Sequence, residues 1–264
     1  MKAKVNGTEL YYEVSGKEGA PWLVLSHSLA CTVRMWDPQV AAFKAKYRIL
    51  NYDMRGHGAS AAPSGPYSLE MLADDVLALM KACAIERASF VGLSIGGMIG
   101  QAFALKHGSK LKSLMLCDTL PASASGGAAL WAERMAAVKK ANSLAGLADS
   151  TMERWFTDAY KTRHPGRWKQ IRDTIAGTTP QGYLGCAAAI QNFDFVPRLP
   201  SLKLPTLVVC GSDDQGTPPA GNRRIAELIP GGRYEEIAGA RHLPNVERPA
   251  EFNRIMMGWL NAQK

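Results

Sequence analysis

The feature that most constrains the fold is a serine between two glycines, placed where a strand pattern changes into a helix pattern. Residues 88–93 favour a strand, a Gly-Leu-Ser-Ile-Gly run closes it, and apolar residues recur at helical spacing from Ile95 onward. A serine on so tight a turn takes strained backbone angles, and Gly92 and Gly96 leave room for it because they carry no Cβ. A flexible loop would not need a strand before the run and a helix after it. The pattern therefore predicts that Ser94 is raised on a strand–helix turn, at a helix N-terminus that favours negative charge.

Strand and helix patterns alternate along most of the chain. Asn6-Gly7 between two alternating runs predicts a hairpin, and the short continuous apolar runs are typical of strands buried on both faces. The alternation predicts an α/β fold with a mostly parallel central sheet flanked by helices. The expected strands are 2–5, 8–14, 22–25, 47–52, 88–93, 111–117, 205–210 and 234–237, and the expected helices are 67–85, 95–106, 219–228 and 249–260.

Residues 121–200 break this alternation. They show no convincing strand, only helical patterns rich in Trp, Met and Ala, and ten basic and six acidic side chains give them a net charge of +4. Two ordinary crossover helices with long loops would be an alternative, but some 80 residues without a strand is too long for them. We expect an α/β core of residues 1–120 and 201–264 with an inserted helical cap of residues 121–200.

Composition excludes several classes of protein. No apolar run approaches the roughly 20 residues needed to span a bilayer, and the N-terminus resembles a strand rather than a signal peptide, so we expect a cytoplasmic protein without a membrane partner. The net charge is +8, but the basic residues are scattered, so no nucleic-acid partner is expected. The five cysteines match no metal-binding spacing, which predicts free thiols and no metal or cofactor.

A serine hydroxyl becomes a nucleophile only with a base, and the base needs an orienting acid. His242 lies in a loop before the last expected helix, and Asp213 and Asp214 lie in a loop directly after the strand expected at 205–210. Loops beyond the carboxyl ends of strands are where the sites of α/β proteins gather. The chain therefore carries a candidate triad of Ser94, His242 and one of two adjacent aspartates.

Four motifs stand out along the chain. They are Gly92-Leu93-Ser94-Ile95-Gly96, Asp53-Met54-Arg55-Gly56-His57-Gly58-Ala59-Ser60, Gly211-x-x-Asp214-x-x-Thr217-Pro218-Pro219 and His242-Leu243-Pro244-Asn245-Val246-Glu247. Through these motifs the chain resembles the α/β-hydrolase fold superfamily over nearly its whole length. The resemblance implies that Ser94, Asp214 and His242 are the catalytic triad, and that Asp213 is a neighbour only. It also implies an oxyanion hole formed by the backbone N–H groups of Leu29 and Ile95.

Further short matches narrow the resemblance. They are Asn6-Gly7-Thr8-Glu9-Leu10-Tyr11-Tyr12, Met35-Trp36-x-Pro38-Gln39-Val40, Gly65-Pro66-Tyr67-Ser68, Arg154-Trp155-Phe156-Thr157, Gly182-Tyr183 and Asn245-x-Glu247-Arg248. Through them the chain is similar, within this superfamily, to bacterial 3-oxoadipate enol-lactonases, enzymes of aromatic-compound breakdown. The resemblance implies an anionic enol-lactone substrate, which suits the positive charge of the cap, where Arg134, Arg154, Arg163 or Arg198 could pair with a carboxylate. The expected substrate contacts are His27, Trp131, Arg134, Trp155 and Leu243.

Two other functions are compatible with the same residues. A carboxylesterase of broad acyl-ester range, with perhydrolase side activity, would use the same triad. A ligand-binding receptor on the hydrolase fold would keep the triad without turnover. In each case the partner is a small molecule, an ester or lactone for the two enzymes, and the protein is expected to be a monomer or a homodimer.

Overall fold

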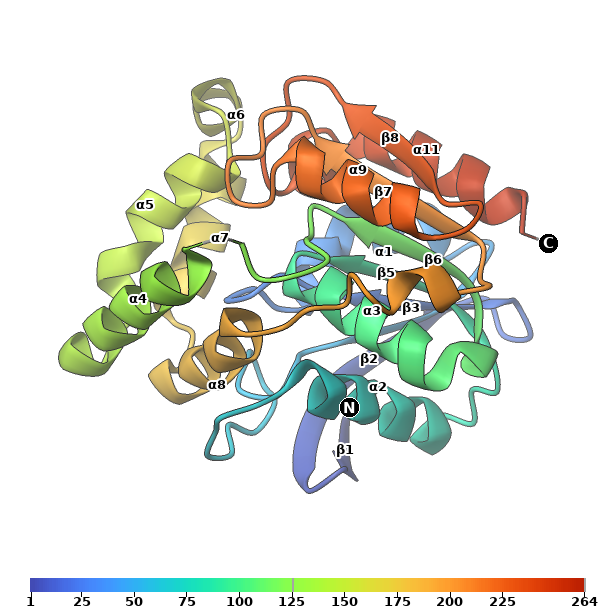
Figure 1. Ribbon diagram of the computed structural model, residues 1–264, viewed down its shortest axis with the longest axis horizontal. Helices are drawn as coiled ribbons and strands as arrows, with labels where there is room; N and C mark the ends of the chain where they lie inside the picture. Colours follow the sequence, from blue (N-terminus) through green and yellow to red (C-terminus); the bar gives the residue numbers. More distant parts are fainter. Residues whose placement is uncertain (125, 264) are drawn as a thin grey trace.

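The structure, a computed structural model, describes residues 1–124 and 126–263, and its centre is an eight-stranded sheet in the order β1-β2-β4-β3-β5-β6-β7-β8 (Figure 1). β2 pairs antiparallel with β1 and β4, and the other neighbours are parallel, which confirms the predicted mostly parallel sheet. The strands are β1 Lys2–Val5, β2 Thr8–Gly16, β3 Trp22–Ser26, β4 Arg48–Tyr52, β5 Ala88–Leu93, β6 Leu111–Cys117, β7 Thr206–Gly211 and β8 Arg233–Ile237.

The predicted hairpin joins β1 to β2. Its two turn residues, Asn6 and Gly7, have φ angles of 46° and 73°, the left-handed conformation that a two-residue hairpin turn requires. Val5 pairs with Thr8 across the turn. The hairpin forms one edge of the sheet, whereas β5, which precedes Ser94, lies in the interior of the sheet.

Helices cover both faces of the sheet. In Figure 1, α2, α3 and α9 lie in front of the sheet and α1 and α11 lie behind it. α2 begins after Ser68, whose hydroxyl accepts a hydrogen bond from the N–H of Met71 and so caps the helix. The core helices are α1 Asp37–Phe43, α2 Leu69–Ala82, α3 Ile95–His107, α9 Pro219–Leu228, α10 Pro244–Glu247 and α11 Pro249–Asn261, with 3-10 turns η1 Val33–Trp36, η2 Gly108–Lys110 and η3 Leu199–Ser201.

Among the described residues, five α-helices lie between β6 and β7, at one end of the molecule (Figure 1). We call residues 121–200 the cap segment. The cap helices are α4 Gly127–Ala141, α5 Ala145–Trp155, α6 Asp158–Arg163, α7 Pro165–Ala176 and α8 Pro180–Gln191. An isolated bridge between Ala122 and Asp194 ties the two ends of the segment together.

α8 packs directly on the turn that follows β4. A Cβ on Gly182 would lie 1.9 Å from the carbonyl oxygen of Gly56, so the two backbones touch and neither position tolerates a side chain. Thr179 caps α8 and donates its hydroxyl to the same carbonyl at 3.0 Å. The cap segment is therefore held on the core at a fixed point.

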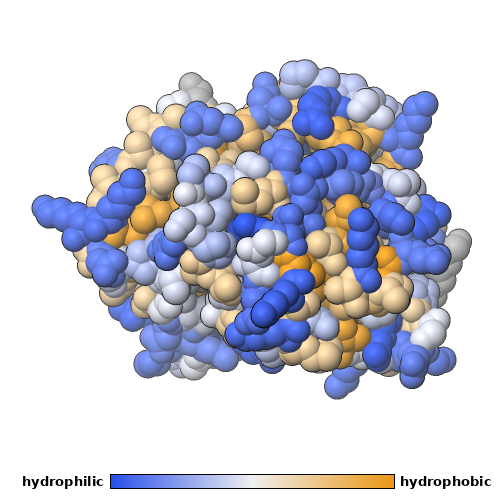
Figure 2. Space-filling view, turned by 90° about the horizontal axis from the view of Figure 1, so that it is seen from below, coloured by the Kyte–Doolittle hydropathy of each residue, from blue (hydrophilic) through white to orange (hydrophobic). Residues whose placement is uncertain are grey.

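The face of the molecule seen in Figure 2 is mixed rather than uniformly apolar or polar. Figure 2 shows one side of the molecule, where hydrophilic side chains alternate with separate apolar patches. Leu130 is a large apolar side chain that stays 47% exposed, on α4 of the cap segment. None of the helices in the described part of the chain combines the length and apolarity that a membrane span needs.

Candidate functional site

Ser94 occupies the predicted turn between β5 and α3. Its φ of 59° and ψ of −120° are strained for a residue with a side chain. A Cβ on Gly92 would lie 2.1 Å from the carbonyl oxygen of Gly96, and a Cβ on Gly96 would lie 2.2 Å from that of Ser26. The turn is possible only because both positions are glycine, as the sequence predicts.

His242 is paired with Asp214. Its Nδ1–H donates to Asp214 Oδ2 at 2.8 Å, and both side chains are buried. Oδ1 of the same carboxylate accepts N–H groups of Gly216 and Thr217 at 2.8 and 3.2 Å, and the Thr217 hydroxyl donates to Oδ2. Asp213 is exposed and accepts the Ser212 hydroxyl, so the geometry assigns the pairing to Asp214.

The environment of Asp214 favours its charged form. Burial alone would raise its pKa, but the charge and hydrogen bond of His242 and the donors of Thr217 outweigh burial and lower the pKa to about 2. The carboxylate therefore stays ionised and fixes the imidazole with its proton on Nδ1. Nε2 is left as the nitrogen that can accept a proton.

Ser94 and His242 line the same cavity, about 220 Å³ in volume, between the cap segment and the core. The rings of Trp155 and His242 lie 5.5 Å apart. Of the predicted substrate contacts, three line this cavity. They are Trp131, Arg134 and Trp155.

The cavity contains two arginines in largely apolar surroundings. The Arg134 guanidinium lies 5.3 Å from the ring centre of Trp131, and Arg154 donates to the Thr151 hydroxyl at 3.2 Å. Burial and the nearby charge of Arg134 lower the pKa of Arg154. No aspartate or glutamate is among the described residues that line the cavity. Its fixed positive charge is thus not balanced by its own walls.

The backbone around Ser94 offers N–H groups to the cavity. Ile95 is the first residue of α3, where helical N–H groups have no partner within the helix. Leu29 lines the cavity, and within residues 1–124 and 126–263 its N–H donates no hydrogen bond. These are the two groups predicted as oxyanion donors.

Two of the predicted substrate contacts, His27 and Leu243, are not among the residues that line the cavity. His27 is fully buried, where its Nε2 accepts the N–H of Met54 at 3.0 Å and its Nδ1 donates to the carbonyl of Ser28 at 2.7 Å. Burial lowers its pKa to about 4, so the ring is neutral. Leu243 is also fully buried in the core. Neither side chain lines the cavity, because each is turned inward by its own packing.

Sequence reasoning missed the residues that hold the pair in place. Thr217 gives Asp214 two hydrogen bonds, and Glu247 accepts the N–H groups of Thr157 and Arg241. Both residues stand inside the motifs quoted above, which was the available signal. Their contacts, however, join segments up to 90 positions apart.

Comparison with known proteins adds independent findings. Residues 21–249 match the family model of the alpha/beta hydrolase fold. The chain is 34% identical to 3-oxoadipate enol-lactonase 2 of Acinetobacter baylyi, over 94% of this chain and 91% of that protein. Among solved structures, the enol-lactonase from Burkholderia xenovorans LB400 is 41% identical with a TM-score of 0.95, over 99% and 100% of the two chains. A thermophilic esterase from Thermogutta terrifontis is 28% identical with a TM-score of 0.93, over 100% and 99%.

Proposed function

Because the chain belongs to the alpha/beta hydrolase fold family, we propose that it opens a small anionic enol-lactone by a serine mechanism. Family membership confirms the predicted superfamily and fold class, and with them the prediction of an enzyme that hydrolyses ester or lactone bonds. The choice of enol-lactone is supported by the similarity to two enol-lactonases of Acinetobacter baylyi and to that of Burkholderia xenovorans.

In the proposed reaction Ser94 Oγ attacks the lactone carbonyl while Nε2 of His242 accepts the hydroxyl proton. Asp214 stabilises the imidazolium through its hydrogen bond to Nδ1–H. The carbonyl oxygen becomes an anion that the N–H groups of Leu29 and Ile95 would stabilise. Collapse breaks the bond to the ring oxygen, which takes the proton from His242, and the opened ring stays on Ser94 as an acyl group. Water, activated by His242, then releases the acid.

The observation that carries the substrate proposal is that Arg134 and Arg154 line the cavity shared by Ser94 and His242. Guanidinium groups bind carboxylates through charge-assisted hydrogen bonds. A lactone that bears a carboxylate would supply the negative charge that the cavity walls lack. Its lactone carbonyl would then face Ser94 while its carboxylate faces the cap segment.

The test compares the enol-lactone with p-nitrophenyl esters, one neutral and one with a terminal carboxylate. We expect kcat/KM to be highest for the lactone, and Ser94→Ala to lower it by at least about 10³-fold. Replacing both cavity arginines by glutamine should raise KM for the two anionic substrates about tenfold to a hundredfold and spare the neutral ester. Arg163→Gln is the control, because Arg163 is exposed and lies outside the cavity.

A broad-range carboxylesterase is the second candidate, favoured by the similarity to the Thermogutta esterase and by the apolar side chains that line the cavity. Lactone turnover no better than turnover of the neutral ester would favour this candidate and contradict the lactonase proposal. Repeated turnover of any of these substrates would exclude a receptor without enzymatic activity. A cytoplasmic location and the oligomeric state, monomer or homodimer, stay predictions.

A further inference from the structure

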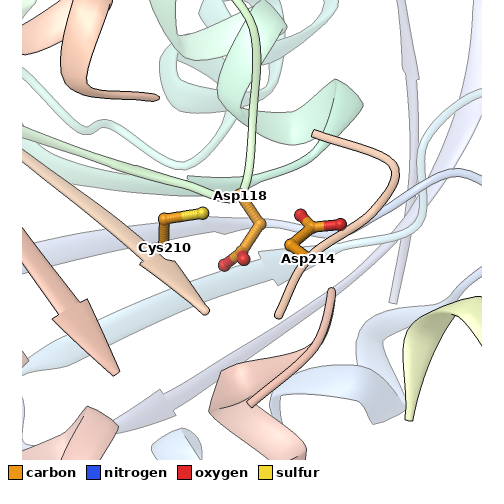
Figure 3. A group of neighbouring side chains, drawn as sticks. All are labelled: Asp118, Cys210 and Asp214. Atoms are coloured by element: carbon orange, nitrogen blue, oxygen red, sulfur yellow. The ribbon is translucent and has the colours of Figure 1, made fainter. Parts of the chain in front are cut away.

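A second buried carboxyl group stands beside Asp214. Asp118 follows β6 and Cys210 lies in β7. One carboxylate oxygen of Asp118, one of Asp214 and the Sγ atom of Cys210 all lie within 4.8 Å of one another (Figure 3). All three side chains are buried. The proposed mechanism uses Asp214 but not its neighbour.

The backbone turns Asp118 toward this cluster. Its φ of 44° is in the left-handed region, and its N–H donates to the carbonyl of Val209 at 2.9 Å. Oδ1 accepts the N–H of Gly211 at 2.9 Å. Oδ2 is buried and has no hydrogen-bond donor among the residues that the structure describes. An ionised oxygen without a donor would be costly in such a place, whereas a protonated one would itself be a donor.

The two carboxyl groups differ strongly in the number of hydrogen bonds that they accept from the protein. Asp214 accepts from His242, from Gly216 and twice from Thr217, whereas Asp118 accepts a single backbone N–H and otherwise has only the weakly donating Cys210 thiol beside it. Two carboxylates this close cannot both be ionised at low cost. Burial and the charge of Asp214 raise the pKa of Asp118 well above its usual range. If the pair of carboxyl groups carries one proton, that proton is therefore expected on Asp118 rather than on Asp214.

Cys210, the third member of the cluster, keeps its own proton and does not take the proton assigned to Asp118. The Cys210 thiol donates toward the carbonyls of Gly211 and Thr217, at 3.3 and 3.6 Å. Burial raises its pKa, so it stays protonated. Nor is the cluster a convincing metal site, because the Asp214 oxygens are already taken by four donors.

We propose that Asp118 is a positioning residue that stays a neutral carboxylic acid and directs its proton at the Asp214 carboxylate. The inference rests on the proposed role of Asp214 in the serine mechanism. A neutral donor on this side holds Asp214 in orientation toward His242. A neutral acid adds no second negative charge to the site. An ionised Asp118 would add one, and that charge would increase the proton affinity of the His242 imidazole.

The test uses Asp118→Asn, which keeps a donor and an acceptor, and Asp118→Ala, which removes both. In the wild-type protein at neutral pH, the infrared spectrum should contain the carbonyl stretch of a buried carboxylic acid, and Asp118→Asn should remove that band. The Nδ1 proton resonance of His242 should persist in Asp118→Asn and shift or broaden in Asp118→Ala. Turnover by Asp118→Ala should fall about tenfold to a hundredfold, the effect of one hydrogen bond to a charged group, and Asp118→Asn should restore most of it.

The opposite result is equally definite. An ionised Asp118 would show no such band, and Asp118→Asn would then move the acidic limb of the kcat/KM profile to lower pH by removing a charge near His242. Either finding overturns the proposal. The spectra need no substrate and can be repeated on Ser94→Ala. A carboxylic-acid band in a protein that hydrolyses neither lactone nor ester would therefore support the assignment of Asp118 while contradicting the proposed function.

Discussion

Glu247 connects the loop that carries His242 to the cap segment. It is 7% exposed, and its Oε1 accepts the N–H of Thr157 at 2.8 Å together with the hydroxyl of the same residue. Oε2 accepts the N–H of Arg241 at 2.7 Å, directly before His242. One carboxylate thus satisfies backbone donors from two segments that are far apart in sequence, and Trp155, next to His242, lies two residues from one of them.

Removing this carboxylate should destabilise the protein measurably. Glu247→Ala leaves two partly buried backbone N–H groups without an acceptor, and each costs about 1–3 kcal/mol, so we take about 3 kcal/mol for the pair. For a chain of this size a loss of 1 kcal/mol lowers Tm by about 2–4 °C. The expected decrease in Tm is therefore about 6–12 °C. Glu247→Gln, which keeps one acceptor, should lie between this variant and the wild type.

The assay is thermal unfolding, followed by kinetics on the folded variants. Glu227→Ala is the matched control, because its side chain is 64% exposed and forms an ion pair with Arg224 at 3.6 Å, a surface pair that contributes little stability. We expect the control to stay within about 0.5 kcal/mol of the wild type. A loosened connection should also lower kcat/KM, since Trp155 would no longer be held against His242. A Tm for Glu247→Ala equal to that of the control would refute the reasoning.

Two further predictions concern titration and thiol chemistry. A carboxyl with a lowered pKa contributes stability that is present above its unfolded pKa and is lost as pH falls toward its folded pKa. Asp214 should therefore account for about 2 kcal/mol of the unfolding free energy that the wild type loses between about pH 4 and pH 2. Asp214→Asn should show a smaller drop over that range, and an equal drop would contradict the assignment. Of the five cysteines only Cys83 is partly exposed, so a thiol reagent should label one site in the native protein and five after denaturation, with Cys83→Ser losing the native site. Native labelling of a second cysteine would count against this packing. The buried cysteines are Cys31, Cys117, Cys186 and Cys210.

Much of the core could be predicted because its determinants are local. The expected strands fall within one or two residues of the observed ones, since short apolar runs bounded by turn residues have few alternatives. The turn at Ser94 was predictable for the same reason, because two glycines and a helix N-terminus lie within five positions. Choosing Asp214 over Asp213 needed the family pattern, and the structure supports it through the donors of Thr217.

What sequence could not supply is the direction of side chains whose partners are distant. His27 stands in the loop expected to face the substrate, yet Met54 offers it an N–H, and the ring turns inward to accept it. Nothing in the sequence around Asp118 distinguishes it from other residues that follow a strand. Its proximity to Asp214 arises only in the folded protein. In both cases the deciding contact is made by another strand's loop, so local pattern carries no information about it.

In the cap segment, helical spacing brings two of the predicted substrate contacts together. Trp131 and Arg134 are three positions apart on α4, so they share one helix face, and the ring holds the guanidinium at the cavity. Arg154 reaches the same cavity from α5, where its pKa is lowered by burial and by Arg134. The two guanidinium groups repel each other, and no carboxylate stands beside them among the described residues that line the cavity. If the substrate is an anion, as proposed above, its carboxylate would offset this repulsion through charge-assisted hydrogen bonds.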